Sequence, residues 1–302
     1  MEIGMIGLGR MGANMSERLM NVGHRVVGYA RRPESVNRLL KKGVVGTYSL
    51  KELVQKLCSP RIIWLMIPAG KPVDTTLEML LELLDEGDIV VDGGNSNYKD
   101  TLRRAAILKE KGIHFVDVGT SGGVWGLKEG YSMMVGGEKE VVEYLHPILE
   151  TLAPAPDKGW NYVGSNGAGH FVKMVHNGIE YGIMEAYAEG FALLKSKEEF
   201  EFDLQSISEI WRYGSVIRSW ILDLIANALQ VDPELNNVMP YVEDSGEGRW
   251  TVFEAIDQNV ATPVIILSLL QRINSRDNEK FSDRLLAVMR EQFGGHKVKR
   301  KE

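Results

Sequence analysis

Six residues near the start of the chain, Gly7-Leu8-Gly9-Arg10-Met11-Gly12, constrain the fold more than any other feature. They directly follow a short apolar strand and open a helix predicted from Ala13 to Val22. In this setting Gly7 permits a tight turn, Gly9 lets a pyrophosphate approach the backbone, and Gly12 lets the helix pack closely on the strand. The six residues therefore predict a dinucleotide-binding turn, because the N–H groups and dipole of the helix attract phosphate. A glycine-rich turn without a ligand is the alternative.

Apolar runs of strand length continue through the first half of the chain and alternate with amphipathic helical stretches. The predicted strands are Glu2–Gly7, Arg25–Tyr29, Ile62–Ile67, Ile89–Asp92, His114–Val118 and Tyr131–Val135. Strands that alternate with helices favour a doubly wound sheet of the Rossmann type. We therefore predict an α/β NAD(P)-binding domain over residues 1–165.

The second strand ends at Ala30-Arg31-Arg32-Pro33, where a chain that selects NAD usually carries an Asp or Glu for the ribose hydroxyls. That acid is absent here. Two guanidinium groups suit a 2′-phosphate instead, because arginine binds phosphate through a bidentate fork. Arg31 and Arg32 therefore favour NADP, with NAD as the second possibility. Arginines that point into solvent are the alternative reading.

Three later strands end in loops rich in small and polar residues. These loops are Pro68-Ala69-Gly70, Gly93-Gly94-Asn95-Ser96 and Thr120-Ser121-Gly122-Gly123. Ligands of open α/β sheets bind at the carboxyl ends of the strands, so we expect the three loops to converge near a bound nicotinamide. Glycine and asparagine are also ordinary turn residues, and each loop taken alone is compatible with a simple turn.

The strand pattern stops at about Gly164, and apolar residues then recur at spacings of three and four. The predicted helices are Ala168–Ser196, Leu204–Tyr213, Ser215–Gln230, Thr251–Asn259, Val264–Ile273 and Lys280–Gln292. We therefore predict an all-α second domain over residues 166–302, which binds substrate and forms the contacts of an oligomer.

The first of these helices carries a dense polar face. Lys173, His176, Asn177 and Glu180 fall within about a third of the helix circumference, and Tyr181 follows them. The neighbouring residues are apolar, which argues against full solvation. The face is therefore either a site or a solvated surface with ordinary ion pairs.

Composition narrows the class of protein. The chain has 302 residues, a net charge of −6 and one cysteine, Cys58. The charge gives no electrostatic argument for nucleic acid, and no apolar run is long enough to span a bilayer. A single cysteine excludes an internal disulfide, leaves no metal-binding cluster and fits the cytoplasm. Its predicted role is packing.

Taken together, six motifs resemble the decarboxylating 6-phosphogluconate dehydrogenases in their short single-repeat form, within the β-hydroxyacid dehydrogenase superfamily. The motifs are GLGRMG, DGGNS from Asp92 to Ser96, SGG from Ser121 to Gly123, GAGHFVKMVHNGIEYG from Gly167 to Gly182, GEGRWT from Gly246 to Thr251 and REQFGGH from Arg290 to His296. The resemblance covers nearly the whole chain. It implies oxidation of 6-phosphogluconate to ribulose 5-phosphate and carbon dioxide with reduction of NAD(P), in the pentose phosphate pathway.

The resemblance also implies roles for single residues. Lys173 matches the base that removes the hydroxyl proton, and Glu180 matches the acid that protonates the enediol. An ordinary lysine has a pKa of about 10.4, so the first role requires a site that stabilises the neutral amine. The substrate contacts implied are those of Asn95, Ser121, Gly122, Gly123, His176 and Asn177. Asn95 also matches a coenzyme contact, and no step needs a metal.

For the substrate phosphate, the family pattern points to Tyr181 and Arg272, with Arg290 and His296 reaching in from the tail of a neighbouring subunit. A homo-oligomer, either a dimer or a tetramer, is therefore expected. The chain departs from the long-chain pattern in one loop, where Ser245 and Glu247 replace a lysine and a threonine. A carboxylate there would repel a phosphate, so either Glu247 turns away or the loop has another role.

Two rival functions remain on the residues alone. A hydroxyisobutyrate dehydrogenase of the same superfamily shares the dinucleotide turn, the SGG loop, Lys173 and Asn177. Its small unphosphorylated substrate needs neither enediol protonation nor a phosphate clamp, so the features that separate the two are His176, Glu180, Tyr181, the DGGNS loop and the cationic tail. A non-catalytic NADP sensor would keep the fold and lose the chemistry, and an intact pair of Lys173 and Glu180 counts against it.

Overall fold

The computed structural model describes residues 1–300. They form two compact units, Met1–Asn177 and a second that begins at Gly178. We call them the sheet unit and the helical unit. Helix α9 (Ala168–Ser196) contributes residues to both. The predicted domain boundary at residue 165 precedes this helix and stays a prediction.

The sheet unit contains an eight-stranded sheet in the order β3-β2-β1-β4-β5-β6-β7-β8. All neighbouring strands are parallel except β6 and β7. The strands are β1 (Glu2–Ile6), β2 (Arg25–Tyr29), β3 (Val45–Thr47), β4 (Ile62–Leu65), β5 (Ile89–Asp92), β6 (His114–Ser121), β7 (Ser132–Gly136) and β8 (Trp160–Gly164). The predicted α/β fold is therefore confirmed. Strands β3 and β8 were not predicted, and β6 continues to Ser121, beyond its predicted end.

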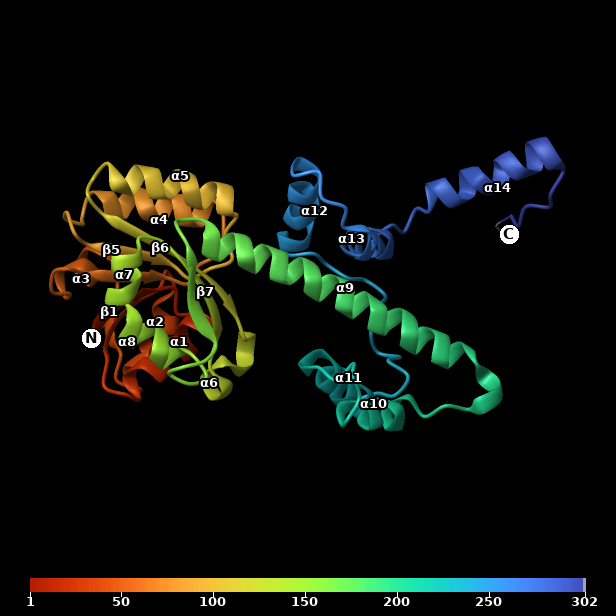
Figure 1. Cartoon of the computed structure of the whole chain (residues 1–302), viewed down its shortest axis with the longest axis horizontal. Coiled ribbons are helices and arrows are strands. Elements are labelled where there is room, and N and C mark those ends of the chain that lie inside the picture. Colours follow the sequence, from red (N-terminus) through yellow and green to blue (C-terminus); the bar gives the residue numbers. More distant parts are fainter. Residues whose placement is uncertain (301–302) are drawn as a thin grey trace. The chain divides into compact units, whose positions relative to one another are not determined.

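Helices cover both faces of the sheet, and each face has its own apolar core (Figure 1). One core uses α1 (Arg10–Met20), α2 (Pro33–Leu40), α7 (Lys139–Tyr144) and α8 (His146–Leu152). The other uses α3 (Leu50–Gln55), α4 (Lys71–Leu81) and α5 (Tyr98–Lys109). A short 3₁₀ turn, Gly123–Trp125, and α6 (Gly126–Glu129) connect β6 to β7. Because both faces are covered, the central strands are buried along their whole length, as parallel strands require.

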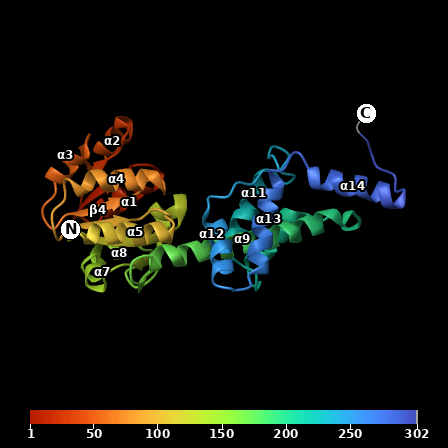
Figure 2. The same cartoon turned by 90° about the horizontal axis from the view of Figure 1, so that it is seen from above.

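The helical unit consists of the rest of α9 and five further helices. They are α10 (Leu204–Arg212), α11 (Trp220–Val231), α12 (Glu247–Asp257), α13 (Pro263–Ser275) and α14 (Phe281–Gly294), with a 3₁₀ turn at Glu198–Phe200. Two views show α14 extending away from the other helices of this unit (Figures 1 and 2), and none of its residues is buried.

Two predicted helix starts were wrong. Helix α11 begins at Trp220 instead of Ser215, because the hydroxyl of Ser219 accepts a hydrogen bond from the Leu222 N–H and caps the helix. Helix α1 begins at Arg10, directly after Gly9 and three residues before its predicted start. Cys58 is exposed, so the packing role predicted for it is wrong.

Candidate active site

The dinucleotide turn has the geometry that a pyrophosphate requires. Gly7 has a φ of +98°, and a Cβ there would lie 2.3 Å from the carbonyl oxygen of Met66. A Cβ on Gly12 would lie 2.0 Å from the carbonyl oxygen of Gly7, whereas a Cβ on Gly9 would meet nothing within 4 Å. Gly9 is the N-cap of α1 and no side chain caps it. The open space and the first N–H groups of α1 therefore fit a bound coenzyme phosphate.

The other three residues of the turn face different surroundings. Leu8 is buried in the core, and its carbonyl oxygen accepts a hydrogen bond of 3.0 Å from Arg38 Nη2. Met11 packs against the same core, and Arg10 is exposed.

Beyond β2, Arg31 and Arg32 are both exposed, and neither guanidinium makes a hydrogen bond or ion pair within residues 1–300. Two cationic side chains are therefore available at the strand end where a ribose would lie.

The loop after β5 is held from within. The Asp92 carboxylate accepts hydrogen bonds from the Gly94 N–H at 3.1 Å and from the Ser96 hydroxyl at 2.7 Å. Thr120, at the end of β6, donates its hydroxyl to the Gly93 carbonyl at 3.2 Å. The predicted loops after β5 and β6 are thus brought together. Within the described part of the chain, Asn95 Oδ1 is buried and has no hydrogen-bond partner.

The SGG segment forms the end of β6 and the following turn. Ser121 is the last strand residue, and Gly122 adopts a φ of +128°, which a residue with a side chain rarely adopts. Gly123 is exposed and opens the 3₁₀ turn. The next residue is tied to the dinucleotide helix, because Asn14 Nδ2 on α1 donates to the Val124 carbonyl at 3.4 Å.

Lys173 is positioned by a buried carboxylate that the sequence analysis missed. Asp117, in the middle of β6, is fully buried and accepts hydrogen bonds from the N–H groups of Gly167 at 2.8 Å and His170 at 2.9 Å. These bonds fix the first turn of α9 on the sheet. One turn further, the Lys173 side chain packs on Gly119, where a Cβ would lie 2.4 Å from the Lys173 Cβ. Lys173 is 5% exposed.

Side chains on the polar face of α9 contact one another. His176 Nδ1 lies 3.4 Å from Lys173 Nζ and 3.0 Å from Asn177 Oδ1. With a hydrogen on Nδ1, His176 donates to Asn177 Oδ1, and Nδ1 then has no lone pair to accept a hydrogen bond from the lysine. Asn177 is buried, and Glu180 is half-buried on the same helix. Lys173 and Glu180 are separated by about two turns, or roughly 10 Å of helix rise.

Within the helical unit, Tyr181 lies at the centre of a second group of predicted residues. Its ring is buried, and the guanidinium carbon of Arg272 lies 3.4 Å from the ring centroid. Arg272 Nη1 also donates to the Glu243 carbonyl at 3.0 Å. The Ser245 N–H lies 3.4 Å from the Tyr181 hydroxyl oxygen, and Gly248 packs directly on the ring. Tyr181 and Arg272 are therefore neighbours, as a joint role in binding one anion requires.

The unusual loop residues bind each other. The Ser245 hydroxyl donates to the Glu247 carboxylate, and Glu247 is buried in the first turn of α12. Asp244 receives hydrogen bonds from Arg249 and Arg276, and the Arg249 guanidinium, followed by that of Arg276, lowers the pKa of Asp244. The Glu247 carboxylate is therefore hydrogen-bonded to Ser245 and shielded from solvent.

Arg290 and His296 lie on α14 and just after it, and both are exposed. The His296 ring packs edge-on against Phe293, with 6.4 Å between the centroids. Their role in the site of a neighbouring subunit stays a prediction. Within residues 1–300, no helix is long and apolar enough to cross a bilayer, and no group of three metal-ligating side chains converges.

Comparisons with known proteins agree with the motifs. Residues 2–164 match the NAD-binding domain of 6-phosphogluconate dehydrogenase, and residues 169–200 and 186–302 match its C-terminal domain. An NAD⁺-dependent decarboxylating 6-phosphogluconate dehydrogenase of Haloferax volcanii is 42% identical over the full length of both chains. An NADP⁺-dependent one of Bacillus subtilis is 39% identical, across 92% of this chain and 62% of its own length.

A solved structure of similar fold is Plasmodium falciparum 6-phosphogluconate dehydrogenase, with a TM-score of 0.83 and 30% identity, covering 100% of this chain and 67% of that one. Matches to both domains and full-length identity above 40% establish the relationship. The chain belongs to the 6-phosphogluconate dehydrogenase family, and its first unit is an NAD(P)-binding domain.

Proposed function

We propose that the protein converts 6-phosphogluconate to ribulose 5-phosphate and carbon dioxide while reducing NADP. The observation that carries this proposal is the polar face of α9, where a buried lysine contacts a histidine and a carboxylate follows on the same helix. Relatives that match along the whole chain and are named 6-phosphogluconate dehydrogenases support it.

The first step is oxidation of the secondary alcohol. The coenzyme, when bound, supplies the hydride acceptor. Lys173 Nζ accepts the hydroxyl proton as the hydride leaves, and it must be neutral to do so. Burial disfavours a charged amine, and Lys173 is 5% exposed. Asn95, whose carboxamide oxygen has no partner within residues 1–300, and the Ser121–Gly123 segment hold the substrate.

The second step is loss of carbon dioxide from the 3-keto acid. The C1–C2 bond breaks and its electron pair forms an enolate, to which the protonated Lys173 donates a hydrogen bond. Glu180 then donates a proton to the enolate carbon, which was C2 of the substrate and becomes C1 of the product, and this gives ribulose 5-phosphate. His176 and Asn177 bind substrate hydroxyls, and Tyr181 and Arg272 bind the phosphate. This division of roles is supported by a cation and a phenol that already lie together.

The preference for NADP over NAD rests on Arg31 and Arg32. Both are exposed at the end of β2, and the four residues that follow the strand, Ala30-Arg31-Arg32-Pro33, include no carboxylate. Some relatives are named NAD⁺-dependent and others NADP⁺-dependent, so the proposed preference is argued from this chain's own residues.

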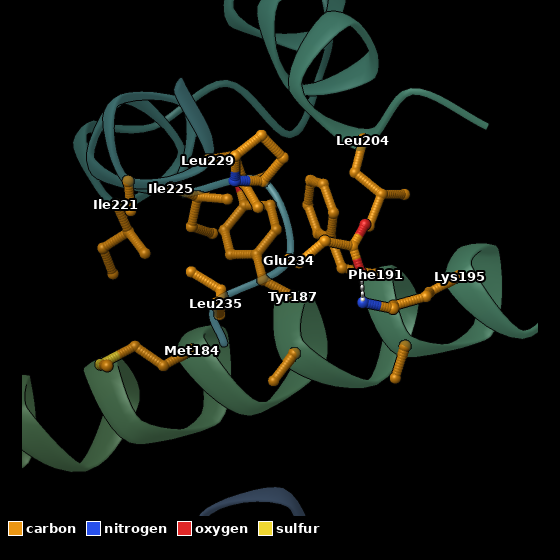
Figure 3. A pocket seen from close by; sticks show the side chains of 14 residues that line it. Met184, Tyr187, Phe191, Lys195, Leu204, Ile221, Ile225, Leu229, Glu234 and Leu235 are labelled. Atoms are coloured by element: carbon orange, nitrogen blue, oxygen red, sulfur yellow. Dashed lines mark hydrogen bonds and ion pairs between the residues drawn. The ribbon is translucent and has the colours of Figure 1, made fainter. Parts of the chain in front are cut away.

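We also propose a homo-oligomer, a dimer or a tetramer, that works in the cytoplasm. Helix α14 buries none of its residues, although it carries apolar side chains such as Phe281, Leu285 and Phe293. A cavity of about 410 Å³ with a mostly apolar lining lies between α9, α10 and α11 (Figure 3). Apolar surfaces of this extent are normally covered by another protein surface, and a second copy is the occupant we propose.

Initial rates test the function directly. The purified protein is assayed with 6-phosphogluconate and either NADP or NAD while released carbon dioxide is trapped. We expect reduced coenzyme and carbon dioxide in equal amounts, with a higher kcat/KM for NADP. A higher value for NAD would overturn the role of the two arginines alone. Turnover with a small unphosphorylated hydroxy acid and none with 6-phosphogluconate would overturn the proposed function.

A further inference from the structure

One buried guanidinium lies behind two of the loops at the candidate site. Arg104, on α5, is 1% exposed. Its Nη2 donates to the Gly70 carbonyl at 3.1 Å, in the loop between β4 and α4. Its Nη1 donates to the Ser96 hydroxyl at 3.2 Å, in the loop between β5 and α5. Two donor nitrogens of one rigid group thus join the two loops. The third nitrogen, Nε, donates to Asp74 on α4 at 2.9 Å.

The contacts form a closed network around Asn95. Ser96, on one side of Asn95, is held by Arg104 and by Asp92, and Gly94, on the other side, is held by Asp92. Arg104 Nη1 lies 3.7 Å from Asp92 Oδ2, so the buried charges compensate each other. Asn95 Oδ1 remains without a partner in the described part of the chain. The neighbours of Asn95 are thus held by hydrogen bonds, while its own carboxamide oxygen accepts none within residues 1–300.

The topology assigns the two loops to one half of the coenzyme. In the strand order, β2 lies on one side of β1 and β4 and β5 lie on the other. The dinucleotide crosses this switch point with its pyrophosphate at the start of α1 and its adenosine ribose at the end of β2. The loops after β4 and β5 therefore face the nicotinamide half.

We propose that Arg104 is a positioning residue that holds the loops after β4 and β5 in the geometry that the nicotinamide and the reacting carbon require. The role rests on the proposed function, because it concerns the alignment for hydride transfer. Arg104 touches neither coenzyme nor substrate and acts through Ser96, Gly70 and Asp92. A lysine cannot replace it, since a point charge cannot donate to Gly70, Ser96 and Asp74 at the same time.

The neighbouring residue provides a matched control. Arg103 also binds Asp74, at 2.8 Å. Hydrogen bonds to Asp74 and then to Asp100 raise the pKa of Arg103. It is 49% exposed, and within residues 1–300 it makes no hydrogen bond to either loop. Arg103→Lys therefore changes the same chemistry on the same helix without releasing the loops.

Two measurements on the full-length protein test the role. Hydrogen exchange without coenzyme reports on the loops, and we expect Arg104→Lys to speed exchange at least tenfold in residues 67–71 and 93–97, with residues 25–40 unchanged. The second measurement compares kcat with the Kd of 2′,5′-ADP, which lacks the nicotinamide. We expect kcat to fall about 10- to 100-fold while that Kd changes less than twofold. Arg103→Lys should change neither quantity.

Other outcomes overturn the role. Unchanged loop exchange, or faster exchange with an unchanged kcat, would show that Arg104 does not align the site. Faster exchange throughout the sheet unit with loss of 2′,5′-ADP binding would make it a structural residue only. If Arg104→Lys does not fold, Ser96→Ala removes one link and must show the same pattern, with a fall of about threefold or more. If the wild-type protein does not turn over 6-phosphogluconate, the proposed function fails. The role of Arg104 is then tested by the ratio of the NADP affinity to the 2′,5′-ADP affinity, which takes the place of kcat as the readout of the nicotinamide half.

Discussion

The sheet unit and the helical unit differ in how much of their apolar surface they bury themselves. Both faces of the sheet pack against helices, and each has an extended core. The helical unit has two small cores, one around Tyr181, Val252 and Leu269 and one around Phe191, Leu222 and Leu229. Many of its large apolar side chains are exposed, and α14 buries none of its residues. The sheet unit therefore covers its own apolar faces, whereas the helical unit leaves many large apolar side chains exposed within residues 1–300.

This difference separates two activities. The dinucleotide turn, Arg31 and Arg32 all belong to the sheet unit, so coenzyme binding should depend on a self-contained structure. In the proposed mechanism, turnover also needs Glu180, Tyr181 and Arg272, which belong to the helical unit. Changes that spare coenzyme binding and abolish turnover are thus the sharpest tests of the comparison.

The largest effect is expected from Lys173→Met. The substitution removes the base and keeps most of the buried aliphatic chain, so we expect kcat to fall about 10³- to 10⁴-fold. The Kd for NADP, measured by calorimetry, should stay within about twofold. Lys195→Met is the control on the same helix, because Lys195 is 53% exposed and pairs with Glu234. A Lys173→Met protein that keeps its kcat would contradict the assigned role.

Asp117→Asn should give the next largest effect, on stability. Asp117 accepts two backbone N–H groups at the start of α9. An asparagine has only one acceptor, and its NH₂ group would face a second donor in a fully buried position. We expect a loss of about 2 kcal/mol of unfolding free energy in urea titrations. Asp157→Asn, at an exposed position, should lose almost none, and equal losses would refute the anchoring of α9.

Periodicity predicted the parts of the molecule that repeat. Helix α9 has the predicted bounds, Ala168–Ser196, because its apolar residues keep one spacing over many turns. The six predicted strands are all present. Strand β3 was missed because three residues, Val45–Thr47, cannot display an alternating pattern. Strand β8 (Trp160–Gly164) has no fully buried residue, so it lacks the apolar run of the central strands.

The residues that hold the loops and helix of the candidate site in place were harder to predict from the sequence than the candidate reactive residues. Arg103 and Arg104 are adjacent and identical in type, yet one is 49% exposed and the other 1%. What distinguishes them is the tertiary contacts of Arg104 with Gly70 and Ser96, which adjacent positions in the sequence do not reveal. Asp117 did give a signal, since a carboxylate within the apolar run of β6 needs a partner. The roles of the residues predicted for substrate and coenzyme remain predictions that the variants test.

Leu285→Asp tests the proposal that a second copy of the chain covers α14. Leu285 lies on α14 and is 47% exposed in one chain. If a second copy covers α14, a buried carboxylate there will disfavour assembly. We expect a smaller mass in light scattering and a kcat/KM for 6-phosphogluconate about tenfold lower, with NADP binding unchanged. Ser282→Asp adds the same charge at an exposed polar position of α14 and should keep the assembly. Unchanged mass for Leu285→Asp would remove α14 from the interface.

The smallest effect compares one acid in each unit. Arg104, then Arg103, lowers the pKa of Asp74 in the sheet unit below its ordinary 3.8, and Arg249, then Arg276, does the same for Asp244 in the helical unit. A carboxylate whose pKa is lower in the folded state stabilises fully above its unfolded pKa, and this stabilisation is lost as pH falls through the folded pKa.

We therefore expect Asp244→Asn and Asp74→Asn each to lower the unfolding free energy by about 1 kcal/mol at pH 7, and the difference from wild type to shrink below about pH 4. Urea titrations followed by hydrogen exchange separate the two units. Asp244→Asn should loosen α12 and α13, and Asp74→Asn should loosen α4 and α5. A difference that grows on acidification would reverse the sign and exclude the arginine pairs as its cause. Loosening of both units by either variant would show that their stabilities are coupled, against the self-contained packing of the sheet unit.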